Sequence, residues 1–169
     1  MPVQRLNHAV LFVRDVERSV AFYQEALGFK VVMGMPGAAF LQASGSSNDH
    51  DLGLFELGAQ AGPSGAGRST VGLYHLAWEV DTLRELERIA VKLGELNALV
   101  GASDHSTTKA LYAKDPDGLE FEVSWLVPAD LLTSETLSGR SAIKPLDIAR
   151  EKERYGADTR GGLGVSIPV

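Results

Sequence analysis

The chain repeats one order of secondary-structure elements, and this repeat constrains its fold more than any other feature. A strand, a helix and three further strands are indicated over about residues 4–57, and again over about 72–127. Residues 58–71 are rich in glycine, alanine, serine and proline and form the linker. An internal repeat indicates modules related by pseudo-symmetry. We therefore predict an α+β fold in which two pseudo-symmetric βαβββ modules form a curved mixed sheet around one cleft.

Helix-capping residues support this division. Asp15 and Thr82 stand at the N-cap positions of the two expected helices, each before a run with apolar residues at helical spacing. Gly28 and Gly94 stand where these helices are expected to end. Because both copies carry the same signals at corresponding places, we treat residues 1–127 as a single domain built from two modules.

Residues 128–169 belong to neither module and form a C-terminal extension. A short helix is indicated near Leu146–Tyr155, and the end of the chain is rich in glycine. Two interpretations stay open for the extension. It covers the cleft or mediates contacts between subunits, or it is a partly ordered tail.

Composition and charge narrow the range of partners. The chain has 16 basic and 22 acidic residues and a formal net charge of −6, which disfavours nucleic acid and anionic membranes as partners. It contains no cysteine, so thiolate catalysis and cysteine-based zinc sites are excluded. The N-terminus lacks the apolar segment of a signal peptide, and no apolar run is long enough to span a bilayer. We therefore expect a cytoplasmic protein.

Two of the four histidines occupy corresponding positions in the two modules. His8 lies in the first strand of one copy and His75 in the first strand of the other. A single histidine in a strand is usually a packed residue, but a repeated one inside an apolar run calls for a common partner, and a metal ion is one such partner. Glu122 lies on the polar side of the alternating run LEFEVSW, which faces either water or the same cleft. Two imidazoles and one carboxylate suit a non-haem Fe(II) site.

The DPDG turn before Glu122 gives a geometric prediction. Pro116 suits the second position of a type I turn, and Gly118 suits the left-handed position that ends a three-residue hairpin loop. This turn places Tyr112 opposite Glu122 on the same face of the hairpin. The phenol would then lie beside the predicted metal, although ordinary strand packing is the alternative for a tyrosine alone.

These residues carry a resemblance to a known family. His8 in NHAVLFV, His75 in YHLAWEV and Glu122 in DPDGLEFEV resemble the vicinal oxygen chelate superfamily, which includes glyoxalases, bleomycin-resistance proteins and dioxygenases. The resemblance covers about residues 4–127. Within the superfamily the chain is most similar to the type I extradiol ring-cleavage dioxygenases, through the segments NDHDLGLF and DHSTTKALYAKDPDGLEFE.

The resemblance implies a complete site. It implies metal binding by His8, His75 and Glu122, and catalytic roles for His50, His105 and Tyr112. His50 corresponds to the acid–base histidine of the extradiol enzymes, and the other two correspond to substrate-binding residues. The implied metal is Fe(II), with Mn(II) as a substitute. The implied substrates are an aromatic diol and O₂, and the implied assembly is a homodimer.

Three alternatives stay open. A glyoxalase-type isomerase or lyase would use a fourth protein ligand and favour Ni(II) or Zn(II). Glu56 is the candidate for this ligand, because Asp49 to Glu56 and Asp115 to Glu122 have the same spacing. A metal-free drug-binding protein of the bleomycin-resistance type would not need the three ligands. A structural or regulatory module has no specific feature in its favour. Many extradiol enzymes also carry a second, metal-free domain that these 169 residues do not include.

Overall fold

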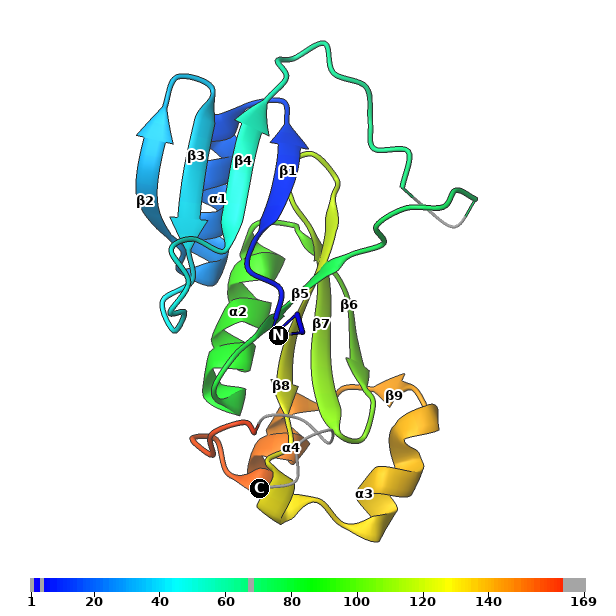
Figure 1. Ribbon diagram of the computed structural model, residues 1–169. Helices are drawn as coiled ribbons and strands as arrows, with labels where there is room; N and C mark the ends of the chain where they lie inside the picture. Colours follow the sequence, from blue (N-terminus) through cyan, green and yellow to red (C-terminus); the bar gives the residue numbers. More distant parts are fainter. Residues whose placement is uncertain (1, 4, 67–68, 163–169) are drawn as a thin grey trace. The chain divides into compact units, whose positions relative to one another are not determined.

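The computed structural model describes residues 2–3, 5–66 and 69–162, and its internal contacts divide the chain into two compact units. Each unit has a mixed sheet and at least one helix (Figure 1). The bounds of the units are residues 1–65 with 115–118 for the first unit, and residues 66–114 with 119–169 for the second. The α+β class predicted from the repeat is therefore confirmed.

The first unit contains a four-stranded sheet with the order β1-β4-β3-β2. β1 and β4 run parallel, whereas the other neighbours are antiparallel. In Figure 1, α1 lies behind this sheet. The elements are β1 (Ala9–Val13), α1 (Val16–Leu27), β2 (Lys30–Met35), β3 (Ala38–Gln42) and β4 (Leu52–Glu56).

Capping residues set the ends of α1, and alternate residues of β4 pack against this helix. The carboxylate of Asp15 accepts a hydrogen bond from the backbone N–H of Arg18, and Gly28 ends the helix in the left-handed conformation with φ of 71°. Both caps agree with the sequence prediction. Leu52 and Leu54 are fully buried on the side of the sheet that packs against α1. Residues between them therefore face the opposite side of the sheet.

The second unit repeats this arrangement in a five-stranded sheet with the order β5-β8-β7-β6-β9. β5 and β8 run parallel and the remaining pairs are antiparallel. The last strand, β9, comes from the C-terminal extension. The other elements are β5 (Leu76–Glu79), α2 (Leu83–Glu95), β6 (Leu99–Asp104), β7 (Thr108–Lys114) and β8 (Glu120–Leu126).

The end of α2 differs from the sequence prediction. Thr82 caps the helix start as expected, by accepting a hydrogen bond from the backbone N–H of Glu85. Gly94, predicted to stop the helix, instead lies inside it, and α2 continues to Glu95. The chain then reverses at Asn97, which has φ of 54°. Asparagine can adopt this left-handed conformation because its short side chain bonds to nearby backbone, so glycine was not the required signal.

The C-terminal extension packs on the second unit. Its elements are η1 (Ala129–Leu131), α3 (Ser134–Ser138), η2 (Gly139–Ser141), β9 (Lys144–Pro145) and α4 (Ile148–Tyr155). The helix predicted near the end of the chain is confirmed as α4. Lys152 of this helix pairs with Glu87 of α2 at 2.6 Å, and the indole N–H of Trp125 donates to the carbonyl oxygen of Thr159 at 3.2 Å. Residues up to 162 therefore form structure rather than a tail, and residues 163–169 lie outside the described part.

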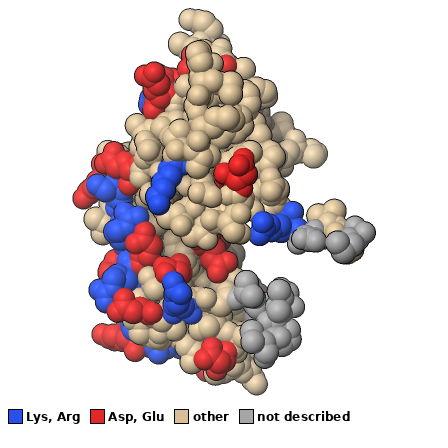
Figure 2. All heavy atoms as spheres, turned by 60° about the vertical axis from the view of Figure 1, so that its left-hand side comes forward, with Lys and Arg blue, Asp and Glu red and all other residues tan. Residues whose placement is uncertain are grey.

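Charged residues of both signs intermix over the face drawn in Figure 2. On α2, Arg88 forms an ion pair with Glu85 at 2.6 Å. None of the helices that the structure describes has the length and apolar character of a membrane span.

Two glycine substitutions test the backbone assignments with opposite signs. Gly118→Ala should lower the free energy of unfolding by about 1 kcal/mol, because φ of 84° at this turn is costly for a residue with a Cβ. Gly94→Ala should raise it by about 0.5–1 kcal/mol, because the position is helical and a Cβ there meets no heavy atom within 4 Å. Urea unfolding of both variants measures the changes. Changes of the same sign would contradict one of the two assignments.

Candidate metal and substrate site

One row of paired residues in the second unit forms the centre of the candidate site. Glu122 of β8 lies opposite Ala77 of β5 on one side and Tyr112 of β7 on the other. The pairing of Tyr112 with Glu122 is the one that the DPDG turn predicted, and Gly118 has the expected left-handed φ. His75 directly precedes β5. The row therefore brings a carboxylate and a phenol together, and His75, two residues before Ala77, adds an imidazole beside the carboxylate.

His75 and Glu122 are as far apart as two ligands of one ion. His75 Nε2 lies 3.3 Å from Glu122 Oε2. Two ligand atoms that are each about 2.1 Å from one ion, at roughly 90–110° to each other, are about 3.0–3.4 Å apart. Among the described residues, the buried Nδ1 atom of His75 has no hydrogen-bond partner. The metal-binding argument therefore rests on Nε2, because an imidazole nitrogen and a carboxylate oxygen at this separation fit a divalent metal.

A hydrogen-bonded chain continues from Glu122 to His105. Tyr112 makes a side-chain hydrogen bond to Glu122, and its hydroxyl oxygen lies 2.9 Å from His105 Nε2. A phenol has one proton, so when it donates that proton to the carboxylate it accepts from the imidazole. His105 itself lies in the turn between β6 and β7.

The surroundings of Tyr112 keep its phenol protonated. Partial burial raises the pKa of Tyr112, and the negative charge of Glu122 raises it further. Tyr74 and the hydrogen bond to Glu122 act in the same direction. Because the pKa lies above the usual value for a tyrosine, the group is a hydrogen-bond donor at neutral pH.

The first unit gathers the other two predicted histidines. The rings of His8 and His50 lie 4.5 Å apart between centroids, and the ring of Phe40 lies 5.0 Å from His50. His8 directly precedes β1, as His75 precedes β5, so the two histidines are equivalent in the repeat. His8 Nδ1 lies 2.7 Å from Asn7 Oδ1, and His50 Nδ1 lies 2.9 Å from Asp49 Oδ2. These contacts set the orientation of both rings.

The loop that carries His50 is organised by Asp51, a residue that the sequence did not single out for this role. Its buried carboxylate accepts hydrogen bonds from the backbone N–H of Ala43 at 2.8 Å, from Ser46 Oγ at 2.7 Å and from Asn48 Nδ2 at 2.7 Å. Several polar residues followed by aspartate in SGSSND are typical of such a loop. The loop is therefore held by one carboxylate.

The sequence predicted Glu56 to be the equivalent of Glu122, but the strand pairing shows that it is not. In the first unit, Gly53 lies opposite Val10 and Phe40, which is the row that corresponds to Ala77, Glu122 and Tyr112 in the second unit. Gly53 is thus the equivalent of Glu122.

Glu56 lies three residues further along β4, on the face that packs against α1. Its Oε2 atom accepts a hydrogen bond from the backbone N–H of Val16 at 3.0 Å, so it caps the helix. The prediction from equal spacing was wrong because the segments before the two strands differ in length: residues 43–51 precede β4, whereas residues 115–119 precede β8.

The predicted site residues therefore fall into three pairs. The structure brings together His75 with Glu122 and His105 with Tyr112 in the second unit, and His8 with His50 in the first. No cluster of three or more potential metal-binding side chains occurs within the described ranges. The set of three ligands from both units stays a prediction.

Comparison with known proteins identifies the family. The sequence profile of the Glyoxalase/Bleomycin resistance protein/Dioxygenase superfamily matches residues 5–123. The chain belongs to this superfamily. A catechol-2,3-dioxygenase of Bacillus subtilis is 33% identical over 121 residues, which are 70% of this chain and 40% of that protein. A lactoylglutathione lyase of Neisseria meningitidis is 32% identical over 124 residues, 70% of this chain and 88% of the lyase.

Other superfamily members widen the range of reactions. A metallothiol transferase FosB of Lysinibacillus sphaericus is 26% identical over 129 residues, 72% of this chain and 82% of the transferase. A glyoxylase/bleomycin resistance protein/dioxygenase domain from Frankia sp. has a TM-score of 0.59 at 21% identity, covering 73% of this chain and 92% of that one, and supports the fold. The chain spans less than half the length of the B. subtilis dioxygenase. Superfamily membership thus leaves the reaction open.

Removing the carboxylate of Asp51 tests the organisation of the His50 loop. Asp51→Ala should lower the free energy of unfolding by about 2–3 kcal/mol, because it leaves several donors in the loop without their acceptor. Asp49→Ala is the matched control, since that side chain is 94% exposed and its removal should have no measurable effect. Thermal unfolding of both variants measures the difference. Equal stability of the two variants would rule out the role given to Asp51.

Proposed function

We propose that the protein is a metal-dependent extradiol dioxygenase, which opens the ring of a catechol-like diol with O₂. The observation that carries this proposal is the hydrogen-bonded chain from His105 through Tyr112 to Glu122, with His75 beside the carboxylate. Such a chain provides donors for the oxygens of a diol next to a pair of potential metal ligands. The likeness to a catechol-2,3-dioxygenase supports the same reaction.

In this proposal His75 and Glu122 hold the metal together with His8 of the first unit. Imidazole and carboxylate ligands suit Fe(II), and Mn(II) accepts the same set. When bound, the ion supplies a common site for the diol oxygens and O₂, and it lowers the pKa of a coordinated hydroxyl. Both oxygen atoms enter the product, so the reaction needs no additional reductant.

The remaining predicted residues act on the substrate. With Glu122 bound to the metal, Tyr112 would donate its one proton to a substrate oxygen instead of to the carboxylate, and His105 would orient the phenol from Nε2, which lies 2.9 Å from the hydroxyl oxygen. His50 accepts a proton from the diol and returns it later in the reaction, as a general acid–base residue does. Phe40 and Val10, which flank Gly53 in the first unit, give an apolar surface suited to an aromatic ring. The homodimer implied by the resemblance is part of the proposal.

A metal-dependent lyase or isomerase is the second candidate. The likeness to a lactoylglutathione lyase over 88% of its length supports it. In its glyoxalase form this candidate requires a carboxylate ligand from the first module, together with Ni(II) or Zn(II). Gly53 occupies the equivalent position and Glu56 caps α1. We therefore favour three protein ligands, which leave more positions for substrate and O₂. A metal-free drug-binding protein would leave the pairing of His75 with Glu122 without a purpose.

Reconstitution with different metals separates these candidates. The purified protein is loaded anaerobically with Fe(II) and mixed with catechol and substituted catechols in air-saturated buffer. We expect O₂ uptake that matches diol consumption and a yellow ring-opened product. The same protein loaded with Ni(II) or Zn(II) is given the hemithioacetal of methylglyoxal and glutathione. Turnover of the hemithioacetal, without O₂ uptake by the Fe(II) form on any diol, would replace the dioxygenase proposal with the lyase.

Installing a carboxylate at Gly53 tests the count of protein ligands. A Cβ at this position comes no closer than 3.4 Å to its neighbours, which is ordinary van der Waals contact. Gly53→Glu should reduce diol cleavage by roughly tenfold or more and strengthen Ni(II) and Zn(II) binding, because a fourth ligand takes a position needed by exogenous ligands. Gly53→Gln has the same shape without the charge and is the control. If both variants lose activity equally and neither binds metal more tightly, the placement of Gly53 beside the metal is wrong.

A further inference from the structure

The C-terminal extension contacts the turn that carries His105. We call residues 104–107, from the last residue of β6 to the residue before β7, the His105 turn. The superfamily profile ends at residue 123, so the extension lies beyond the matched region. Three separate parts of the extension, namely α3 with the glycine after it, β9 and α4, reach this turn or the residues that hold it.

The His105 turn has a backbone conformation that needs support. Ser106 has φ of 68°, in the left-handed region that residues with a Cβ rarely adopt. The backbone N–H of Ser106 donates to Asp104 Oδ1 at 2.7 Å, and the N–H of Thr107 donates to the carbonyl oxygen of His105 at 2.8 Å. Non-glycine residues persist in such a conformation when surrounding contacts determine it.

The first contact comes from α3 and the residue that follows it. Ser106 Oγ donates a hydrogen bond to the carbonyl oxygen of Thr136 at 2.8 Å. Gly139 packs directly against Ser106, where a Cβ would come within 2.7 Å of Ser106 Oγ and 3.1 Å of its Cβ. Glycine is therefore the residue that lets the extension approach the turn this closely.

The second contact is made by β9. Its residues Lys144 and Pro145 pair with Asp104 and Ser103 of β6 as an antiparallel strand. This pairing covers the edge of the sheet where β6 enters the turn. Strand pairing restrains the backbone on the N-terminal side of His105, while α3 restrains it on the C-terminal side.

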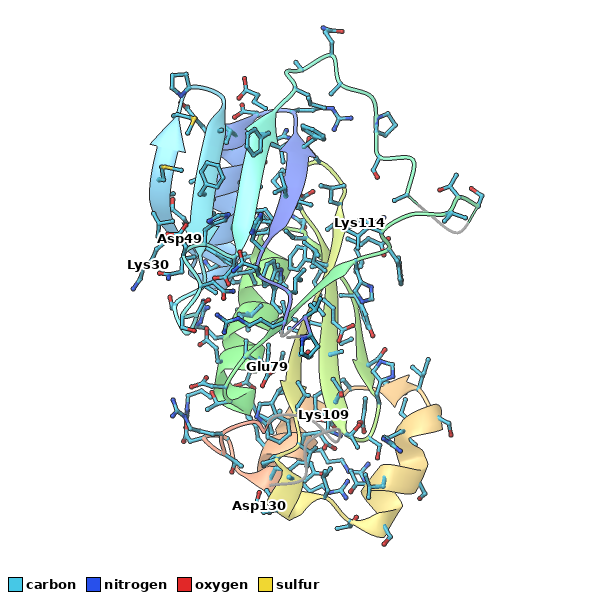
Figure 3. The ribbon with its side chains drawn as sticks, in the orientation of Figure 1. Lys30, Asp49, Glu79, Lys109, Lys114 and Asp130 are labelled. Atoms are coloured by element: carbon cyan, nitrogen blue, oxygen red, sulfur yellow. The ribbon has the colours of Figure 1, made fainter. Side chains whose placement is uncertain are left out.

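The third contact is a buried cluster of charges around Lys109, which is labelled in Figure 3. Lys109 of β7 is fully buried, and its Nζ atom lies 2.5 Å from Asp104 Oδ1 and 2.9 Å from Glu151 Oε2 on α4. A buried ammonium group requires both carboxylates, because removing one partner leaves charge uncompensated in the interior. Glu151 therefore helps to hold Lys109 against Asp104, whose carboxylate in turn holds the N–H of Ser106.

Asp104 keeps its charge in this cluster. Partial burial raises the pKa of Asp104, but the hydrogen bonds from Lys109 and from the N–H of Ser106 outweigh burial and lower it. The carboxylate is thus ionised at neutral pH and remains an acceptor for both groups.

We infer that the C-terminal extension is a positioning element for His105, which it holds in reach of Tyr112 by fixing the His105 turn through Ser106, β9 and the buried Lys109. Gly139 and Glu151 are then positioning residues, which act on the site without touching the substrate. The effect on catalysis rests on the proposed dioxygenase function, whereas the effect on His105 itself does not.

A substitution at Gly139 tests the first contact. Gly139→Ala should displace Ser106, shift the nitrogen NMR resonances of the His105 imidazole, and speed hydrogen exchange at the Ser106 amide by about tenfold, as expected for the loss of a hydrogen bond. Gly94→Ala, on α2, is the control and should leave both readouts unchanged. Assignment of the His105 resonances comes from their absence in His105→Gln.

A charge substitution tests the third contact independently. Glu151→Gln keeps the shape of the side chain but removes the charge that faces Lys109, and it should produce the same changes at His105 and Ser106. Glu153→Gln, at an exposed position of the same helix, is the matched control. Circular dichroism of all four variants verifies that the fold is retained. If Gly139→Ala fails to fold, the result from Glu151→Gln decides the test.

The activity readout is kept separate from the structural one. If the wild-type protein cleaves diols, both positioning variants should lower kcat with iron content unchanged, and their controls should not. Unchanged His105 resonances and Ser106 exchange in folded Glu151→Gln would overturn the inference, as would equal changes in Glu153→Gln. An inactive wild-type protein would refute the proposed reaction but leave the NMR and exchange test of positioning intact.

Discussion

The register of β5, β8 and β7 is the constraint on which the candidate site depends. It places Ala77, Glu122 and Tyr112 in one row, on the face of the sheet opposite α2. A slip of one residue would turn Glu122 and Tyr112 toward the helix and bring apolar neighbours to the site. The turn ending at Gly118 prevents this slip, because its left-handed φ suits a hairpin loop of defined length.

The two modules share this register but differ in chemistry. The row in the first unit has Val10, Gly53 and Phe40, where the second has Ala77, Glu122 and Tyr112. At this row, therefore, the first copy has apolar residues or glycine where the second copy has Glu122 and Tyr112. Each copy keeps one histidine directly before its first strand.

The extension shows how residues outside the superfamily profile become part of the second unit. Lys109 lies in the matched region, yet one of its two carboxylate partners, Glu151, comes from α4. Within the modules, Asp104 of β6 supplies the other carboxylate to this fully buried ammonium group. The partners of Lys109 tie the extension to Asp104 and Ser106, which are next to His105 in the chain.

Local signals in the sequence were sufficient to predict the repeat, the helix starts at Asp15 and Thr82, and the pairing of Tyr112 with Glu122. Each of these features depends on a few neighbouring residues. Long-range packing decided the rest. Equal spacing pointed to Glu56, but the path of the loop held by Asp51 brings Gly53 into the row instead. The partners of Lys109 likewise lie on β6 and α4. The local periodicity of the sequence does not indicate which distant segments contact each other. Tertiary structure alone determines those contacts, because they arise from burial shared between elements far apart in the chain.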